Sequence, residues 1–202
     1  MESKQRILTE VESMFMRYGL KSVTMDDISR SLGISKKTLY QYVENKADLI
    51  QQVMLKHIED ETAAIINIHN DSKNAIDEML KIAAYVAELL RGMSPTTLYD
   101  LKKYYRSSWD LVESLHMKQV YQIIKENLEW GKKEGLYREE IDTDILAKLY
   151  TGMSDIIVDD TLFSLSDYDR ENLHGEFIRY HIHGIASKAG LKLLEKYTKT
   201  KK

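Results

Sequence analysis

Hydrophobic side chains in residues 1–70 recur every three or four positions, as they do on one face of an α-helix. The first stretch, residues 3–18, carries six of them, namely Ile7, Leu8, Val11, Met14, Phe15 and Tyr18. Two shorter stretches centre on residues 28–32 and 39–43, and a fourth runs over about 46–69. The pattern therefore predicts three helices followed by one long helix.

The same spacing continues beyond residue 70. Predicted helices cover residues 75–92, 95–106, 108–133, 142–163 and 169–197. Glycines and helix-capping residues mark several of the boundaries, as Gly92 and Asp142 do. The sequence thus predicts an all-α protein of about nine helices.

Composition agrees with a helical intracellular protein. The 202 residues include one Pro and no Cys, with 30% charged and 43% hydrophobic residues. No apolar run approaches the roughly 18 residues of a membrane span. The first ten residues, MESKQRILTE, lack the apolar segment of a signal peptide. We therefore expect a cytoplasmic protein with no membrane partner, and the missing cysteines exclude disulfides and thiolate metal sites.

Local signals in residues 22–50 predict a helix-turn-helix. Thr24 and Asp27 form the pattern of a capping box, Gly33 permits a tight turn, and Ser35 caps the next helix. That helix is too short to gain much from its own hydrogen bonds. In a helix-turn-helix, however, the second helix lies in the DNA major groove and presents its N-terminal residues to base edges. The alternative is an ordinary corner of a helical bundle.

Net charge does not decide between these readings. Residues 1–50 carry a net charge of +1, from 8 Lys or Arg against 7 Asp or Glu, and the remaining residues carry −4. A prediction of DNA binding must therefore rest on where the positive side chains lie.

Residues 24–49, TMDDISRSLGISKKTLYQYVENKADL, resemble the N-terminal domain of the TetR family of bacterial transcriptional regulators. The run G-I-S-x-x-T-L-Y-x-Y-x-x-x-K-x-x-L carries the resemblance, which is strong over residues 5–55 and elsewhere extends only to helix count and chain length. It implies a helix-turn-helix DNA-binding domain over residues 1–48. A long helix would join it to an effector-binding and dimerisation domain, a helical bundle over residues 49–202. Val43 departs from the family, which usually has Phe there.

The resemblance also implies a role for each residue of a DNA-binding set: Thr24, Ser35, Lys36, Lys37, Thr38, Tyr40, Gln41, Tyr42 and Lys46. Lys36, Lys37 and Gln41 lie where the family reads bases. Tyr40 and Tyr42 are expected to hydrogen-bond phosphates, and Thr38 to do either. Thr24 and Lys46 each open a helix, whose backbone amides and dipole can hold a phosphate. The implied partner is double-stranded DNA with a near-palindromic operator.

Residues 108–133 predict a helix whose apolar side chains spread over about half its circumference, wider than on an ordinary surface helix. Three polar residues, Glu113, His116 and Asn127, fall inside this arc. One hypothesis is a small-molecule pocket, since buried polar groups need partners. Its lining would be Tyr85, Leu89, Tyr104, Trp109, Glu113, His116, Met117, Tyr121, Asn127 and Leu128. The alternative is a packed core whose polar members bond one another or lie at an edge in water.

The last two predicted helices carry apolar stripes, which the resemblance assigns to a homodimer interface. The predicted interface residues are Tyr150, Met153, Ile157, Phe177, His181, Gly184 and Ile185. Gly184 within a helix costs stability, which close approach of another helix would explain. A buried core within one chain is the alternative. His181 and His183 face different sides of a helix, so we expect no metal there.

Together these features favour a dimeric, sequence-specific transcriptional regulator, a repressor released from DNA by a small-molecule effector. We find no Ser-His-Asp spacing, phosphate-binding glycine loop or HExxH motif, so we expect neither an enzyme nor a cofactor. The alternatives are an activator, a ligand-independent regulator, and a helical ligand carrier or scaffold whose helix-turn-helix is silent.

Overall fold

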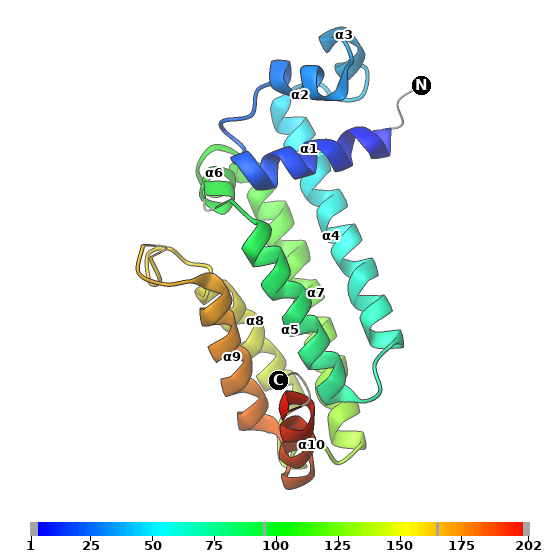
Figure 1. The fold of residues 1–202 in the computed structure, drawn as a ribbon, viewed down its shortest axis with the longest axis vertical. Helices are drawn as coiled ribbons and strands as arrows, with labels where there is room; N and C mark the ends of the chain where they lie inside the picture. Colours follow the sequence, from blue (N-terminus) through cyan, green and yellow to red (C-terminus); the bar gives the residue numbers. More distant parts are fainter. Residues whose placement is uncertain (1–3, 95, 165, 200–202) are drawn as a thin grey trace. The chain divides into compact units, whose positions relative to one another are not determined.

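The computed structural model describes residues 4–94, 96–164 and 166–199, and these residues form ten α-helices (Figure 1). The all-α prediction is confirmed, with one helix more than the nine expected. The chain divides into two compact units. Unit 1 comprises Met1–Ala63 and Gly92–His116, and unit 2 comprises Ala64–Arg91 and Met117–Lys202.

Unit 1 contains the helix-turn-helix. Its helices are α1 (Lys4–Tyr18), α2 (Met25–Leu32), α3 (Lys36–Leu39) and α6 (Thr96–Tyr104), with the first parts of α4 (Lys46–Asn70) and α7 (Arg106–Lys133). One hydrophobic core joins them, built from buried side chains that include Ile7, Val11, Phe15, Ile28, Leu39, Leu49, Ile50 and Leu101. Five of the six hydrophobic residues assigned to the first helix thus belong to this core or pack against it, whereas Tyr18 is 53% exposed.

Helix α6 is bonded to the end of α1 and to the loop that follows it. The Ser94 amide donates to Met16 O at 2.6 Å, and the Thr97 hydroxyl donates to Phe15 O at 3.3 Å. The Lys21 amide donates to the buried Asp100 carboxylate at 2.9 Å. Helix α6 is therefore part of the same compact unit as the helix-turn-helix, although it follows it by about sixty residues. Pro95, predicted at the start of this helix, lies outside the described residues.

Unit 2 contains the rest of α4 and α7, most of α5 (Ala75–Gly92), and α8 (Thr143–Ile156), α9 (Arg170–Ile185) and α10 (Lys188–Lys199). Its core includes Ile76, Met79, Ile124, Leu128, Tyr137, Phe177, Ile178 and Ile182. Helices α8 and α9 lie side by side (Figure 1), with the Tyr150 and Phe177 rings 4.7 Å apart.

The prediction of one helix over residues 169–197 is wrong, because the chain breaks into α9 and α10. Ala186 is extended (φ −67°, ψ 141°) and pairs with Tyr137 in an isolated β-bridge. The Arg138 amide donates to Ile185 O and the Ser187 amide donates to Leu136 O, both at 2.9 Å. The Ser187 hydroxyl then accepts the Gly190 amide and caps α10. Backbone groups of Ile185 and Ser187 therefore bond to the loop after α7, and not to the next turn of a continuous helix.

Helix α8 ends at Ile156, short of the predicted residue 163, and α3 has a single helical turn. Among the described residues, no helix is both long and apolar enough to cross a bilayer.

Candidate nucleic-acid interface

The start of α2 and the turn after it have the geometry that the sequence predicted. The Thr24 hydroxyl accepts the Asp27 amide, and the Asp27 carboxylate accepts the Thr24 amide at 3.0 Å, which completes the capping box. Gly33 ends the helix in the left-handed region at φ 66°, which favours glycine. The Ile34 amide then donates back to Ser29 O at 3.0 Å, so the chain turns sharply into α3.

Helix α3 is held by its surroundings more than by its own length. Ser35 caps it by accepting the Thr38 amide, and its hydroxyl lies 2.8 Å from the Thr38 hydroxyl. The inner side chains Leu39 and Val43 are buried in the unit 1 core. Val43 is thus buried in spite of being smaller than the Phe usual in the family. One helical turn suffices here because packing supplies the stability that a short helix lacks.

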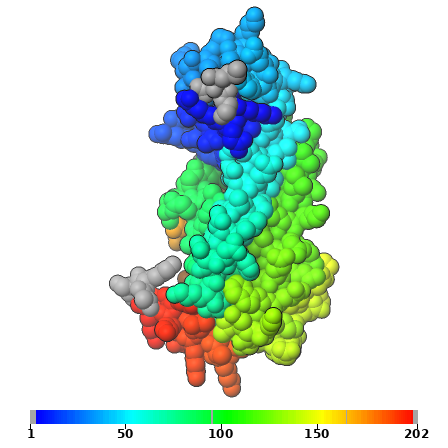
Figure 2. All heavy atoms as spheres, turned by 90° about the vertical axis from the view of Figure 1, so that its right-hand side faces the viewer, coloured from blue at the N-terminus to red at the C-terminus, as the bar shows by residue number. Residues whose placement is uncertain are grey.

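The outer side of this element carries the predicted DNA-binding side chains. Lys36, Lys37, Tyr40 and Gln41 are exposed, and Thr38 and Tyr42 are half-buried. The atoms of α2 and α3, in mid-blue, form one end of unit 1 in the space-filling view (Figure 2). The two lysines, the glutamine and the tyrosine hydroxyl are therefore available to a ligand that meets α3 end-on.

Lys46 opens α4 beside this surface. Its ammonium lies 3.3 Å from Lys21 O, in position to donate to it, and burial lowers its pKa although Asp100 and Asp27 oppose the shift. The Asn45 side chain accepts the Asp48 amide at 3.0 Å and caps the helix. The N-terminus of α4 thus combines the positive end of the helix dipole with the Lys46 ammonium, which lies beside the Lys21 carbonyl.

Sequence reasoning missed one partner of the predicted set. The Asp26 carboxylate on α2 forms an ion pair of 2.6 Å with Lys36 on α3. The position of Asp26 in the first turn of α2 has a local explanation, since negative charge is favourable there. The signal that it pairs with Lys36 is the Gly33 turn, which folds α3 back beside α2.

Residues 7–53 match the model of the bacterial regulatory proteins of the tetR family. The match spans α1 to the first turns of α4, including the whole surface described above. Residues 7–53 therefore form a DNA-binding region of the TetR family.

Relatives of this chain include transcriptional regulators. A Bacillus subtilis protein named "Uncharacterized HTH-type transcriptional regulator YvaF" is 26% identical over 156 residues, 77% of this chain and 80% of that protein. The Escherichia coli protein "Probable acrEF/envCD operon repressor" is 19% identical over 176 residues, 84% of this chain and 80% of that one. These relatives, with the family match, identify the chain as a transcriptional regulator with a helix-turn-helix.

The fold is similar to that of solved regulators over nearly the whole chain. A proposed transcriptional regulator of Saccharomonospora viridis, solved in complex with choline, superposes with a TM-score of 0.68 at 18% identity. The alignment covers 92% of this chain and 98% of that one. The helical part beyond residue 53 therefore has the TetR-family fold as well.

The ten residues predicted to line a ligand pocket are divided between the two units. In unit 1, Trp109 is buried in the core, and the exposed Tyr104 accepts a hydrogen bond from Lys21. Glu113 is half-buried, and the His116 ring lies 3.7 Å from the Glu61 carboxylate.

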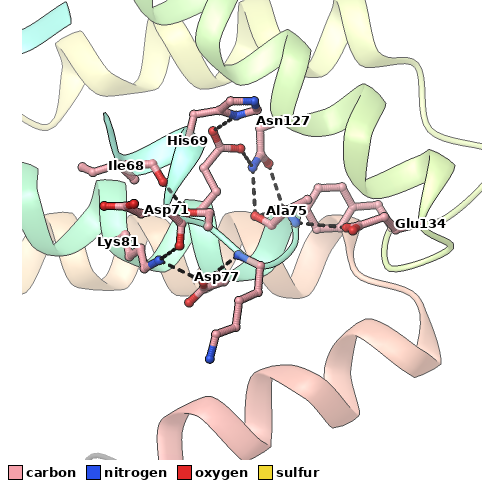
Figure 3. A network of polar contacts seen from close by, with 12 residues as sticks. Ile68, His69, Asp71, Ala75, Asp77, Lys81, Asn127 and Glu134 are labelled. Carbon is pink, nitrogen blue, oxygen red and sulfur yellow. Dashed lines mark hydrogen bonds and ion pairs between the residues drawn. The ribbon is translucent and has the colours of Figure 1, made fainter. Parts of the chain in front are cut away.

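In unit 2, two of the predicted pocket residues belong to the packed core. Leu128 is fully buried, and the buried Asn127 amide donates to Ala75 O at 2.8 Å and to Glu78 Oε2 at 2.7 Å (Figure 3). The Tyr137 hydroxyl donates to the Asn127 side-chain oxygen at 2.9 Å. Asn127 thus has protein partners for its amide, as the packed-core alternative required.

The other four, Tyr85, Leu89, Met117 and Tyr121, are half-buried. The Tyr121 hydroxyl donates to Asp144 at the start of α8, at 2.5 Å. These four are thus the predicted pocket residues of unit 2 that the core does not fully bury.

The seven residues predicted for a dimer interface also differ in exposure. Tyr150, Phe177, His181 and Ile185 are buried within the chain's own unit 2 core or against it. Met153 and Ile157 are half-buried beside that core, and Gly184 is exposed with open space beside it.

Large apolar side chains outside the predicted set are exposed instead on α8. Ile145, Leu149 and Ile156 are 55%, 56% and 46% exposed. They are spaced by four and seven residues, so they lie along one face of the helix. Their spacing was visible in the sequence, but the sequence did not say which of the two apolar faces of α8 the chain covers itself.

Proposed function

We propose that this TetR-family regulator is a homodimeric repressor that binds a near-palindromic operator and leaves it when a small molecule binds. The observation that carries the proposal is the short α3, whose buried side anchors it in unit 1 while Lys36, Lys37, Tyr40 and Gln41 face outward. Arg and Lys hydrogen-bond guanine, Gln hydrogen-bonds adenine, and Tyr hydroxyls bind phosphates. The outer side of α3 thus offers the side-chain types that DNA recognition uses.

The dimer part of the proposal is supported by the exposed face of α8. Ile145, Leu149 and Ile156 form an apolar stripe, and a contiguous apolar surface of this kind marks an interaction site. Gly152 on α8 and Gly184 on α9 have no atom near the position of a Cβ, so another helix can approach closely there. We infer that a second copy covers this face through α8 and α9, with Met153 and Ile157 at its edge.

A two-fold axis through such a dimer presents two α3 helices to DNA. The half-sites of the operator would then be related by the same two-fold axis and lie about 34–36 Å apart, or a multiple of it. The operator is therefore expected to be a near-palindrome.

The effector part is supported by the choline bound to the similar Saccharomonospora viridis structure. In this chain the half-buried Tyr85, Leu89, Met117 and Tyr121 of unit 2 are the predicted contacts that the core leaves open. Repression as the sign of control is supported by the name of the Escherichia coli relative. The site of action would be the cytoplasm, where the DNA is.

The experiment that tests the proposal is selection of duplexes from a random-sequence pool by the purified full-length protein. Binding of the selected duplexes is then measured at two salt concentrations, because each neutralised phosphate steepens the logarithmic salt dependence by about 0.9. Enrichment of a near-palindrome, bound by a dimer, supports the proposal. A confirmed dimer that enriches no sequence overturns it in favour of a carrier or scaffold. Reporter expression with and without the bound operator then separates a repressor from an activator.

A further inference from the structure

Lys36, the first residue of α3, is paired with a carboxylate of the preceding helix. Its ammonium lies 2.6 Å from Asp26 Oδ1, and the two side chains are 51% and 60% exposed. The hydrogen bond to Asp26 raises the pKa of Lys36. The lysine at the start of α3 is thus occupied by an internal anion when no DNA is bound.

Lys37, the next residue, differs in this respect. It is exposed, and among residues 4–94, 96–164 and 166–199 it has no ion-pair partner. Before DNA binds, the two neighbouring lysines of the predicted base-reading set therefore differ, because Lys36 is held in an ion pair and Lys37 is not.

Asp26 lies where a DNA phosphate is also expected. It belongs to the first turn of α2, whose amides and dipole attract anions, and Thr24 at this helix start is predicted to sit against the DNA backbone. A carboxylate offers an ammonium the same charge-assisted hydrogen bond that a phosphate oxygen does. Lys36 cannot use its full charge for a phosphate while it remains bonded to Asp26.

We propose that Asp26 competes with DNA phosphates for Lys36 and thereby weakens sequence-independent binding. The inference rests on the proposed DNA-binding function and concerns the same surface. Phosphate contacts supply nearly all non-specific affinity, whereas base contacts supply discrimination. On DNA of random sequence Lys36, which the family resemblance assigns to base reading at the operator, contacts phosphates, so restraining it lowers the first contribution. Asp26 is therefore a positioning residue that lowers the affinity of this surface for bulk DNA.

The test compares Asp26→Asn with Glu44→Gln in the full-length protein. Both substitutions remove one negative charge from the helix-turn-helix region, and Glu44 is exposed with no ion-pair partner in the part of the chain that the structure describes. Binding to a fluorescent duplex of random sequence is measured by anisotropy over a series of NaCl concentrations. The affinity of Glu44→Gln measures the general effect of removing one negative charge. The difference in affinity between the two variants then measures the effect of breaking the Asp26–Lys36 ion pair.

We expect Asp26→Asn to bind the random duplex about two- to five-fold more tightly than Glu44→Gln at low salt, the range set by exposed ion pairs. Its logarithmic salt dependence should steepen by up to about 0.9, one phosphate contact. The gain should disappear when Lys36 is also replaced, in Asp26→Asn with Lys36→Ala compared with Lys36→Ala alone. Thermal melting of each variant, and Asp26→Ser as a second substitution at the same position, separate loss of folding from loss of the pair.

Equal affinities of Asp26→Asn and Glu44→Gln would overturn the inference, as would a gain that persists without Lys36. In either case the wild-type protein still binds duplex DNA in a salt-dependent way, and the proposed function stands. If the folded wild-type protein binds no duplex at any salt concentration, the proposed function fails and the inference fails with it.

Discussion

At the scale of single residues, the helix-turn-helix depends on short side chains that each satisfy one backbone group. Thr24 and Asp27 cap α2, Ser35 caps α3 and Asn45 caps α4, and the sequence alone predicted the caps of α2 and α3. Capping is local, because the cap and the amide it binds are two or three residues apart. The ion pair between Asp26 and Lys36 is not local, and it was missed for that reason.

Lys37 is the residue whose loss should weaken sequence recognition most directly. Lys37→Ala removes an exposed donor that has no ion-pair partner among the residues that the structure describes. We expect about ten-fold weaker binding to the selected operator, within the range of one good base contact. The measurement is a titration of the operator duplex by anisotropy. Lys192→Ala, an exposed lysine of unit 2, is the matched control, and equal effects of the two would contradict the assignment.

At the scale of elements, α6 shows how a helix distant in sequence completes the DNA-binding unit. It satisfies two carbonyl groups at the end of α1 and one amide in the following loop. Gly19 in this loop has a φ of 81° and approaches Thr96 so closely that a Cβ would lie 2.5 Å from its hydroxyl oxygen. The sequence placed this helix with the effector domain, since nothing local links residues 96–104 to residues 15–21.

Removing the carboxylate of α6 should therefore destabilise the DNA-binding unit. Asp100→Ala removes the buried carboxylate that accepts the Lys21 amide in a part-buried hydrogen bond, and a hydrogen bond to a charged group contributes about 1.5–3 kcal/mol. Urea denaturation, followed by circular dichroism, measures the change in free energy of unfolding. Asp110→Ala, which breaks an exposed pair with Arg106, should change it by less than about 0.5 kcal/mol. Similar losses in both variants would show that the α6 bonds do not stabilise unit 1.

At the scale of the whole molecule, assembly should depend on the face of α8 that the chain does not cover itself. Leu149→Glu places a charge in the middle of the exposed stripe, where a partner helix would have to desolvate it. Because Leu149 is 56% exposed, the monomer should fold normally. Sedimentation velocity should then show a shift from dimer to monomer. Ile66→Glu, an equally exposed apolar position on α4, should remain dimeric, and a dimeric Leu149→Glu variant would rule out this face.

The stability of the molecule should also fall on mild acidification because of a buried histidine. Burial lowers the pKa of His181 to about 4, and its Nε2 has no hydrogen-bond partner within the described part of the chain. In the unfolded chain His181 binds a proton near its ordinary pKa of about 6.5, whereas in the folded chain it stays neutral until the pH approaches 4. Stability is therefore full above about pH 6.5 and declines as the pH falls toward 4, by up to about 3 kcal/mol for this group.

His181→Phe tests this pH dependence. The ring lies edge-on to Tyr150, with centroids 4.8 Å apart, and 6.4 Å from the Phe177 ring, so another aromatic side chain should be accommodated there. Denaturant unfolding at pH 7.5, 6.5 and 5.5 should give a smaller loss of stability in His181→Phe than in the wild type. His183→Phe alters an exposed histidine and should keep the wild-type profile. An unchanged profile in His181→Phe would assign the acid sensitivity to other groups, such as His174, whose pKa burial also lowers.

The sequence by itself determined most of the helices, the caps of α2 and α3, the turn at Gly33 and the family motif. These features depend on hydrophobic spacing and on contacts within a few residues, which a linear sequence contains. Only the tertiary structure decided the break between α9 and α10, the membership of α6 in unit 1, the partners of Asn127 and Lys36, and the covered face of α8. Each of these is settled by a group from another helix or loop. A hydrogen bond or a packed side chain depends on distance in space, and that distance exists only once the chain has folded.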